Sequence, residues 1–205
     1  MIVVLDYGVC NVGSIQNMLK KIGAKDVKIS ADAADIAQAN HLILPGVGSF
    51  DMGMQSLEQM HLVDPIREYA LIKKSPLLGI CLGMQMLGRG SEEGTKEGLG
   101  LIPMECKKFH FENDSRLKVP HMGWNRAFFE KETPLTKGIE SPQRYYFVHS
   151  YHAVCDEKQY ELMYSEYGYR FTCGVHNGNI YGVQFHPEKS HQYGMKLLKN
   201  FVEQC

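Results

Sequence analysis

The stretch Pro76-Leu-Leu-Gly-Ile-Cys-Leu-Gly-Met-Gln85 decides the fold and points to the chemistry. A short apolar run ends in Gly-Ile-Cys-Leu-Gly, and a segment with helical character follows. A nucleophile between two such glycines is the pattern of a sharp strand-to-helix turn. Gly79 and Gly83 carry no Cβ, so the backbone can fold tightly and expose the side chain between them. We therefore predict that Cys81 is a nucleophile at a helix N-terminus, where the helix dipole favours thiolate.

The segments before this turn alternate between short apolar runs and amphipathic stretches. This alternation is typical of βα units around a parallel sheet flanked by helices. Predicted strands are Ile2–Leu5, Val27–Ile29, His41–Leu44 and Leu77–Ile80, and predicted helices are Val12–Ile22, Asp32–Gln38 and Met52–Lys74, with a break near Pro65.

After Gly98 the pattern changes to short β-like runs, with a hairpin-turn signal at Asn177-Gly178 and a final helix over Gln192–Glu203. The runs are Lys107–Phe111, Trp124–Phe129, Tyr145–Val148, His152–Val154, Phe171–Val175 and Ile180–Phe185. The sequence shows no linker and no repeat, so it predicts a single α/β domain over residues 1–205. Its central sheet is mixed but mostly parallel, and its second half is β-rich.

Composition excludes several classes of function. The 205 residues carry a net charge of −1, which does not favour binding to nucleic acids or anionic membranes. No apolar run approaches the roughly 18 residues of a membrane span, and the N-terminus lacks the basic region of a signal peptide. The six cysteines are scattered without a CxxC pair, so we expect free thiols and a cytoplasmic location.

The histidines show no metal-ligand spacing with cysteine, so no metal site and no cofactor is predicted. This holds for His121, His149, His152, His176 and His191.

A base for the thiol is available in Gln184-Phe-His-Pro-Glu188. If the preceding run is a strand, His186 and Glu188 leave its end on the same side. The histidine can take the thiol proton, and the carboxylate can orient the ring and stabilise imidazolium. By itself, His-Pro-Glu is more simply a solvated surface turn. In combination with the Cys81 turn, we predict a nucleophile, a base and an orienting carboxylate.

A third element is Leu44-Pro-Gly-Val-Gly-Ser-Phe50, which follows a buried strand and precedes a helix. Its glycines let backbone N–H groups approach an oxygen that gains charge during acyl transfer. Together with the Leu82 amide, this loop would form an oxyanion hole. The alternative is a plain glycine-rich turn; a phosphate loop is excluded because the Gly-Lys-Ser/Thr ending is missing.

Taken together, Pro45-Gly-Val-Gly48, Gly79-Ile-Cys-Leu-Gly-Met-Gln85 and Gln184-Phe-His-Pro-Glu188 resemble the motifs of class I, triad-type glutamine amidotransferases. They occur in that family's order and spacing, and the resemblance covers essentially the whole chain. Asp6-Tyr-Gly8, Pro120-His-Met-Gly-Trp-Asn125, Tyr146-Phe-Val-His-Ser-Tyr151 and Glu188-Lys-Ser190 resemble, within the family, glutaminase subunits of imidazole glycerol phosphate synthases in histidine biosynthesis.

The resemblance implies a thioester mechanism without a cofactor. Cys81 would attack the side-chain amide of L-glutamine, His186 would act as base and then protonate the departing ammonia, and Glu188 would orient His186. The oxyanion hole would involve Val47, Gly48 and Leu82, and the substrate would be bound by Gly48, Gln85, Ser150 and Tyr151.

The same resemblance implies a partner. Ammonia would pass through a channel to a (β/α)8-barrel synthase subunit, in a heterodimer with this chain. The oxyanion loop would need the partner's signal, so isolated activity would be weak. The residues implied to lie toward the partner are Asn11, Met122, Trp124, Lys189 and Ser190.

One departure from the family pattern stands near the N-terminus, where Cys10 occupies the position of a second glycine. A Cβ is unfavourable there if the residue has positive φ. We expect Cys10 to be a packed, non-catalytic residue.

Three alternatives stay open for the role of the chain. A subgroup with similar motifs supplies ammonia for sugar amidation in bacterial surface glycans, and the acceptor chemistry lies in the partner. An inactive, glutaminase-like scaffold is a second alternative, against which the intact Cys81, His186 and Glu188 argue. A generic cysteine hydrolase is a third, and the context of Gln85 favours glutamine over it.

Overall fold

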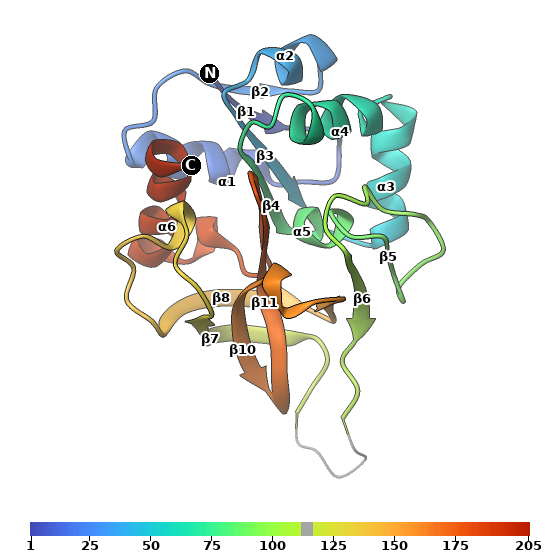
Figure 1. The fold of residues 1–205 in the computed structure, drawn as a ribbon, viewed down its shortest axis with the longest axis vertical. Helices are drawn as coiled ribbons and strands as arrows, with labels where there is room; N and C mark the ends of the chain where they lie inside the picture. The colour runs from blue at the N-terminus through green and yellow to red at the C-terminus, as the bar shows by residue number, and fades with distance from the viewer. Residues whose placement is uncertain (112–116) are drawn as a thin grey trace.

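A mixed β-sheet organises the protein in this computed structural model, which describes residues 1–111 and 117–205 (Figure 1). Its main path runs β2-β1-β3-β4-β12-β11-β10-β7-β8, and β9, which pairs with β11, continues the branch to β6 and β5. The strands are β1 Ile2–Leu5, β2 Val27–Ser30, β3 His41–Gly46, β4 Leu77–Cys81, β5 Gly90–Ser91, β6 Met104–Lys108, β7 His121–Phe129, β8 Gln143–His149, β9 Tyr151–Cys155, β10 Glu161–Tyr167, β11 Tyr169–Asn177 and β12 Ile180–Val183.

The sheet changes direction at β12. The pairs β1–β2, β1–β3, β3–β4 and β4–β12 are parallel, whereas β11–β12, β10–β11, β7–β10 and β7–β8 are antiparallel. The carboxyl ends of β3, β4 and β12 therefore lie side by side, and the antiparallel half extends beyond them (Figure 1). Adjacent carboxyl ends at such a change of order are where α/β proteins place their sites.

Helices cover both faces of the parallel half, with α1 and α6 on one side and α3 and α4 on the other (Figure 1). The α-helices are α1 Val12–Lys21, α2 Ala33–Gln38, α3 Phe50–Gln59, α4 Val63–Leu71, α5 Leu82–Met86 and α6 His191–Gln204, with 3-10 turns at Pro134–Thr136, Lys158–Tyr160 and Pro187–Lys189.

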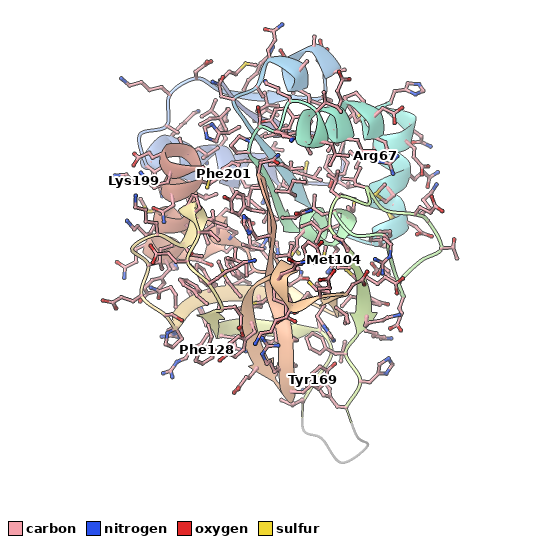
Figure 2. All side chains as sticks on the ribbon, in the orientation of Figure 1. Arg67, Met104, Phe128, Tyr169, Lys199 and Phe201 are labelled. Carbon is pink, nitrogen blue, oxygen red and sulfur yellow. The ribbon has the colours of Figure 1, made fainter. Side chains whose placement is uncertain are left out.

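Alternation along β1 separates the two cores. Val3 and Leu5 pack with the cluster under α3 and α4, whereas Ile2 and Val4 join the cluster under α1 and α6. On α6, Lys199 is on the outer side and Phe201 is fully buried (Figure 2). A period of two in the strands and of 3.6 in the helices produces this separation.

The predicted α/β class, with a parallel first half and a β-rich second half, is confirmed. The Asn177-Gly178 turn joins β11 to β12 as predicted, with Gly178 at φ +62°. The predicted break in the helical segment is present but lies a few residues before Pro65, because α3 ends at Gln59 and α4 begins at Val63. Pro65 lies in the first turn of α4, where its missing N–H would have had no helical partner.

Candidate active site

Cys81 stands at the junction of β4 and α5 with φ +55° and ψ −112°, a backbone conformation that residues other than glycine rarely adopt. Gly83, two residues on, lies so close to β3 that a Cβ there would be 1.8 Å from the Leu44 carbonyl oxygen. A Cβ at Gly79 would be 2.7 Å from the Gly83 oxygen. The two glycines are therefore required by close packing of α5 onto the sheet, which holds Cys81 in its strained conformation.

His186 reaches Cys81 because β12 lies beside β4 in parallel register, with Val183 paired to Ile80. The strand ends at Val183, and a 3-10 turn at Pro187–Lys189 brings Glu188 back to the imidazole. His186 Nδ1 and Glu188 Oε1 are 2.7 Å apart, and the side chains are only 2% and 4% exposed. The predicted contact is thus present, although a turn makes it and the strand is shorter than expected.

Proton positions in this pair follow from the hydrogen bonds. An ionised carboxylate only accepts, so His186 donates from Nδ1. His186 Nε2 is buried, and among the described residues it has no hydrogen-bond partner. Nε2 is therefore the nitrogen left to exchange a proton with the thiol.

Electrostatics favour the charged imidazole. Burial by itself lowers the pKa of His186, but Cys81 and Glu188 together outweigh it and raise the pKa well above its ordinary value. An imidazolium beside a thiolate is the activated form of a cysteine nucleophile.

Ser190, for which the resemblance implies a position toward the partner, makes hydrogen bonds within the chain. It is fully buried, its hydroxyl donates to the His186 carbonyl at 2.7 Å, and it accepts from the Tyr146 amide at 3.0 Å. The His186 amide in turn donates to the Tyr146 carbonyl at 2.9 Å. Ser190 therefore fixes the histidine against β8 and is not part of the exposed surface.

A cavity of about 320 Å³ opens in front of Cys81, of the size that takes a small ligand. It brings together all the residues predicted for the oxyanion hole and for the substrate. Its lining is Val47, Gly48, Cys81, Leu82, Gln85, Glu93, Pro120, Val148, His149, Ser150, Tyr151, His186 and Lys189.

Gln85 lines the cavity, and its side chain is anchored within the protein. Its Nε2 donates to the Tyr151 carbonyl at 3.3 Å and to Gln184 Oε1 at 3.0 Å. Gln184 in turn donates from Nε2 to Cys81 Sγ at 3.7 Å. These bonds connect Gln85 to the backbone at Tyr151, and they place a donor on the Cys81 sulfur.

One backbone N–H of the predicted oxyanion loop is already hydrogen-bonded within the protein. The Val47 amide donates to the Val9 carbonyl at 2.9 Å, so this N–H is already used. Gly48 follows at φ +99°. Leu82 is the first residue of α5, and N–H groups in the first helical turn have no intrahelical partner.

Glu93 lines the cavity and was not predicted. It follows β5, and its Oε2 accepts from the Phe50 amide at the start of α3, at 2.8 Å. No local motif marks it, because only the tertiary contact between the β5 turn and α3 brings it to the site.

Of the residues predicted to face a partner, Asn11, Met122, Trp124 and Lys189 are exposed. Trp124 stacks on His191 with ring centres 5.7 Å apart, and the Arg144 guanidinium lies 5.6 Å from its ring centre. An exposed tryptophan beside arginine is typical of the centre of a protein interface.

Cys10 fits its position without strain, because it is not among the residues with positive φ. Its thiol donates to the Leu5 carbonyl at 3.4 Å and contacts Asp6 Oδ1 at 3.6 Å. Burial raises the pKa of Cys10 to about 11, so it is a packed thiol and not a nucleophile at neutral pH.

Among residues 1–111 and 117–205, no group of three or more His, Cys, Asp and Glu side chains could hold a metal ion. Within the same residues, no helix is long and apolar enough to cross a membrane.

Comparison with known proteins gives a consistent result. The family model "Glutamine amidotransferase class-I" matches residues 3–205. "Imidazole glycerol phosphate synthase subunit HisH 2" of Pseudomonas aeruginosa is 52% identical over 203 residues, 99% of each chain. The protein of the same name from Methanococcus maripaludis is 50% identical over the full length of both. "Imidazole glycerol phosphate synthase subunit HisH" of Sulfurimonas denitrificans is 47% identical over 99% of this chain and 98% of its own.

Solved structures agree on the fold. A putative GMP synthase protein from Thermoplasma acidophilum superimposes with a TM-score of 0.74 at 22% identity, over 100% of this chain and 92% of that one. A chain of PurLQS from Thermotoga maritima gives 0.73 at 19% identity, over 98% and 96%.

Proposed function

The chain belongs to the class I glutamine amidotransferases, and we propose that it is the glutaminase subunit of an imidazole glycerol phosphate synthase. It hydrolyses L-glutamine to glutamate and ammonia for histidine biosynthesis. The observation that carries this assignment is the buried His186–Glu188 pair beside the strained Cys81, at one end of a cavity lined by the family's motifs. The similarity of the full chain to three such subunits supports the same role.

In the acylation step, the Cys81 sulfur attacks the side-chain amide carbon of glutamine, and the C=O electron pair moves to oxygen. The Leu82 amide, at the start of α5, donates to this oxyanion. When the C–N bond breaks, His186 gives its Nε2 proton to the nitrogen, and ammonia leaves. The product is a thioester between Cys81 and the γ-carbonyl.

In the deacylation step, neutral His186 takes a proton from water, and the resulting hydroxide adds to the thioester. Glutamate leaves, and the thiolate–imidazolium pair is restored. Glu188 keeps Nδ1 protonated throughout, so that Nε2 is the nitrogen that exchanges the proton.

The lining of the cavity fits an amino-acid substrate. The Glu93 carboxylate supplies a counter-charge for an α-ammonium group, and the backbone at Ser150 and Tyr151 offers polar groups to the α-carboxylate. Gly48 leaves space at the loop, since a Cβ there would meet no heavy atom within 4 Å.

The geometry does not favour an inactive scaffold, because the nucleophile and its base are assembled in the isolated chain. The three relatives are named as synthase subunits, so a partner subunit is expected, and we propose that it is a (β/α)8 barrel. It would dock near Asn11, Met122, Trp124 and Lys189 and receive ammonia before water protonates it. The six free cysteines support a cytoplasmic location.

The test is glutamate release by the chain alone and with the barrel subunit of its own genome. We expect strong stimulation by the partner and loss of nearly all activity in Cys81→Ser. Cys155→Ser is the matched control, because Cys155 is half-buried and does not line the cavity. An unaffected Cys81→Ser variant refutes the mechanism.

The pathway is tested separately, by complementing a histidine auxotroph that lacks its glutaminase. Growth supports the histidine role. Failure to complement, combined with loss of glycan amidation on deletion, would transfer the same glutaminase chemistry to sugar amidation.

A further inference from the structure

Two buried histidines that the mechanism does not use form a hydrogen-bonded chain behind the substrate edge. His121 begins β7 and His149 ends β8, and the register of the two strands pairs them directly. They are 3% and 5% exposed. His121 Nδ1 lies 2.9 Å from His149 Nε2, and His149 Nδ1 lies 2.7 Å from the Tyr151 carbonyl oxygen. Asn125 Nδ2 lies 3.2 Å from His121 Nε2.

The ends of this chain fix every proton in it. The Tyr151 carbonyl can only accept, so His149 carries its proton on Nδ1, and in a neutral ring Nε2 then accepts. His121 must therefore donate from Nδ1, which leaves its own Nε2 as acceptor for Asn125. The Asn125 amide is oriented independently, since Nδ2 also donates to the Glu166 carbonyl and Oδ1 accepts from the Arg126 amide.

The surroundings keep both rings neutral. His121 is stacked between Phe147 and Tyr167, with ring centres 4.9 and 4.1 Å away. Burial lowers the pKa of His121 to about 4 and that of His149 to about 3. A proton added to either ring would place two donors opposite each other, so the chain requires the neutral forms.

The chain ends at the cavity. The Tyr151 carbonyl accepts from both His149 and Gln85, and Gln85 continues through Gln184 to the Cys81 sulfur. Two donors on one carbonyl define the orientation of the peptide between Tyr151 and the next residue. That segment borders the space where the substrate is proposed to bind.

We propose that His121 and His149 are positioning residues for glutamine binding, both protonated on Nδ1, which hold the Tyr151 edge of the cavity against strand β7. This role rests on the proposed glutaminase function, whereas the assignment of the protons rests on the hydrogen bonds alone. β7 also carries the exposed Met122 and Trp124 next to His121. The two hydrogen-bonded histidines therefore connect the surface proposed to bind the partner with the cavity edge at Tyr151.

The first test needs no activity. Nitrogen-15 spectra of the full chain at pH 7, with imidazole labels, report which ring nitrogen carries the proton. We expect the Nδ1–H form for both His121 and His149. An Nε2–H form or a charged ring at either position overturns the proposal.

The second test uses two substitutions of His121, which separate the effect of losing its hydrogen-bond donor from the effect of losing its ring packing. The two explanations predict opposite orders of the KM for glutamine. His121→Asn keeps a donor near the position of Nδ1 but loses the ring, whereas His121→Phe keeps the ring but loses the donor. If the donor positions the substrate edge, His121→Phe leaves His149 Nε2 unpaired and raises the KM for glutamine about tenfold, while His121→Asn stays closer to wild type. In both variants, kcat of the complex stays within about threefold, because the triad is not touched.

The reverse ranking, with His121→Asn worse than His121→Phe, assigns only packing to the ring and overturns the proposal. His176→Phe is the matched control, because His176 is a half-buried histidine that packs on Tyr181 and bonds to the Gly178 carbonyl, but it does not line the cavity. Its KM should stay within about twofold of wild type. If the wild-type complex releases no glutamate, the proposed function fails, while the tautomer test still decides the proton positions.

Discussion

Replacing Gly83 by alanine tests the packing that presents the nucleophile. A Cβ at this position would lie 1.8 Å from the Leu44 carbonyl oxygen and 2.8 Å from its carbon. Ordinary contact begins at 3.4 Å, so α5 and β3 must separate by roughly 1.5 Å. Both clashing atoms belong to backbone, so no side-chain rotation can relieve the overlap.

We expect Gly83→Ala to lower the free energy of unfolding by about 3 kcal/mol, the upper end of the cost of overpacking. For a chain of this length, that corresponds to a drop in Tm of about 6–12 °C. Because Cys81 and the Leu82 amide move with α5, kcat/KM should fall at least about 10²-fold, as a misplacement of about 1 Å does in other enzymes.

The assays are urea unfolding and glutamate release by the complex, and Gly13→Ala is the matched control. Gly13 lies in α1, where a Cβ would meet no heavy atom within 4 Å and φ is not positive. Alanine in a helix is favoured over glycine, so the control should gain about 0.5–1 kcal/mol. A Gly83→Ala variant that is within about 1 kcal/mol of wild type and keeps half of its activity would refute the packing argument.

Three further predictions concern single side chains near the site. Cys10→Gly should keep kcat/KM within about twofold, since Cys10 is a packed thiol; loss of glutamine hydrolysis would contradict this. Glu188→Gln should lower the pKa of His186 in an NMR titration. Because that pKa is raised in the folded state, its stabilisation is complete below about pH 6.5 and is lost as pH rises through the raised value. The variant's stability deficit should therefore shrink in alkali, and a deficit independent of pH counts against the ion pair. Ser190→Ala should slow Cys81 alkylation and lower kcat by about tenfold, because it removes a hydrogen bond that holds His186. The affinity for the partner should stay unchanged; weaker partner binding would instead support an interface role for Ser190.

Much of the parallel half was predictable because its signals are local. Apolar runs, helical periodicity and the glycines around Cys81 each occupy a few consecutive residues, and they fix β4, α5 and their turn. The asparagine–glycine turn likewise defines the β11–β12 hairpin. Strand β10, Glu161–Tyr167, was missed, since buried and exposed residues do not alternate along it and register shifts interrupt its pairing with β11.

What the sequence could not supply is register between distant strands. The pairing of His121 with His149 depends on how β7 lies against β8, and no local pattern encodes it. The same holds for Glu93, which reaches the cavity through a contact with α3. For Ser190, the resemblance implied a position toward the partner, and no motif encodes the two hydrogen bonds that connect it to His186 and Tyr146.

The proposed catalytic triad and the proposed oxyanion loop differ in whether their groups are already positioned for the reaction. The proposed nucleophile, its base and the orienting carboxylate are assembled within the chain, and contacts of Gly83, Ser190 and Gln184 hold them in place. The Val47 amide, by contrast, is committed to the Val9 carbonyl.

We therefore predict that stabilisation of the oxyanion, and not formation of the thiolate, limits glutamine hydrolysis by the isolated chain. One absent oxyanion donor costs about 3–4 kcal/mol, or roughly 10²–10³ in rate. A partner that contacts the loop beside Asn11 needs only to break the Val47–Val9 hydrogen bond to recover this factor. Alkylation of Cys81 should consequently be nearly as fast without the partner as with it, while glutamate release differs by the full factor. Equal stimulation of both reactions would place the partner's effect on the thiolate and contradict this division.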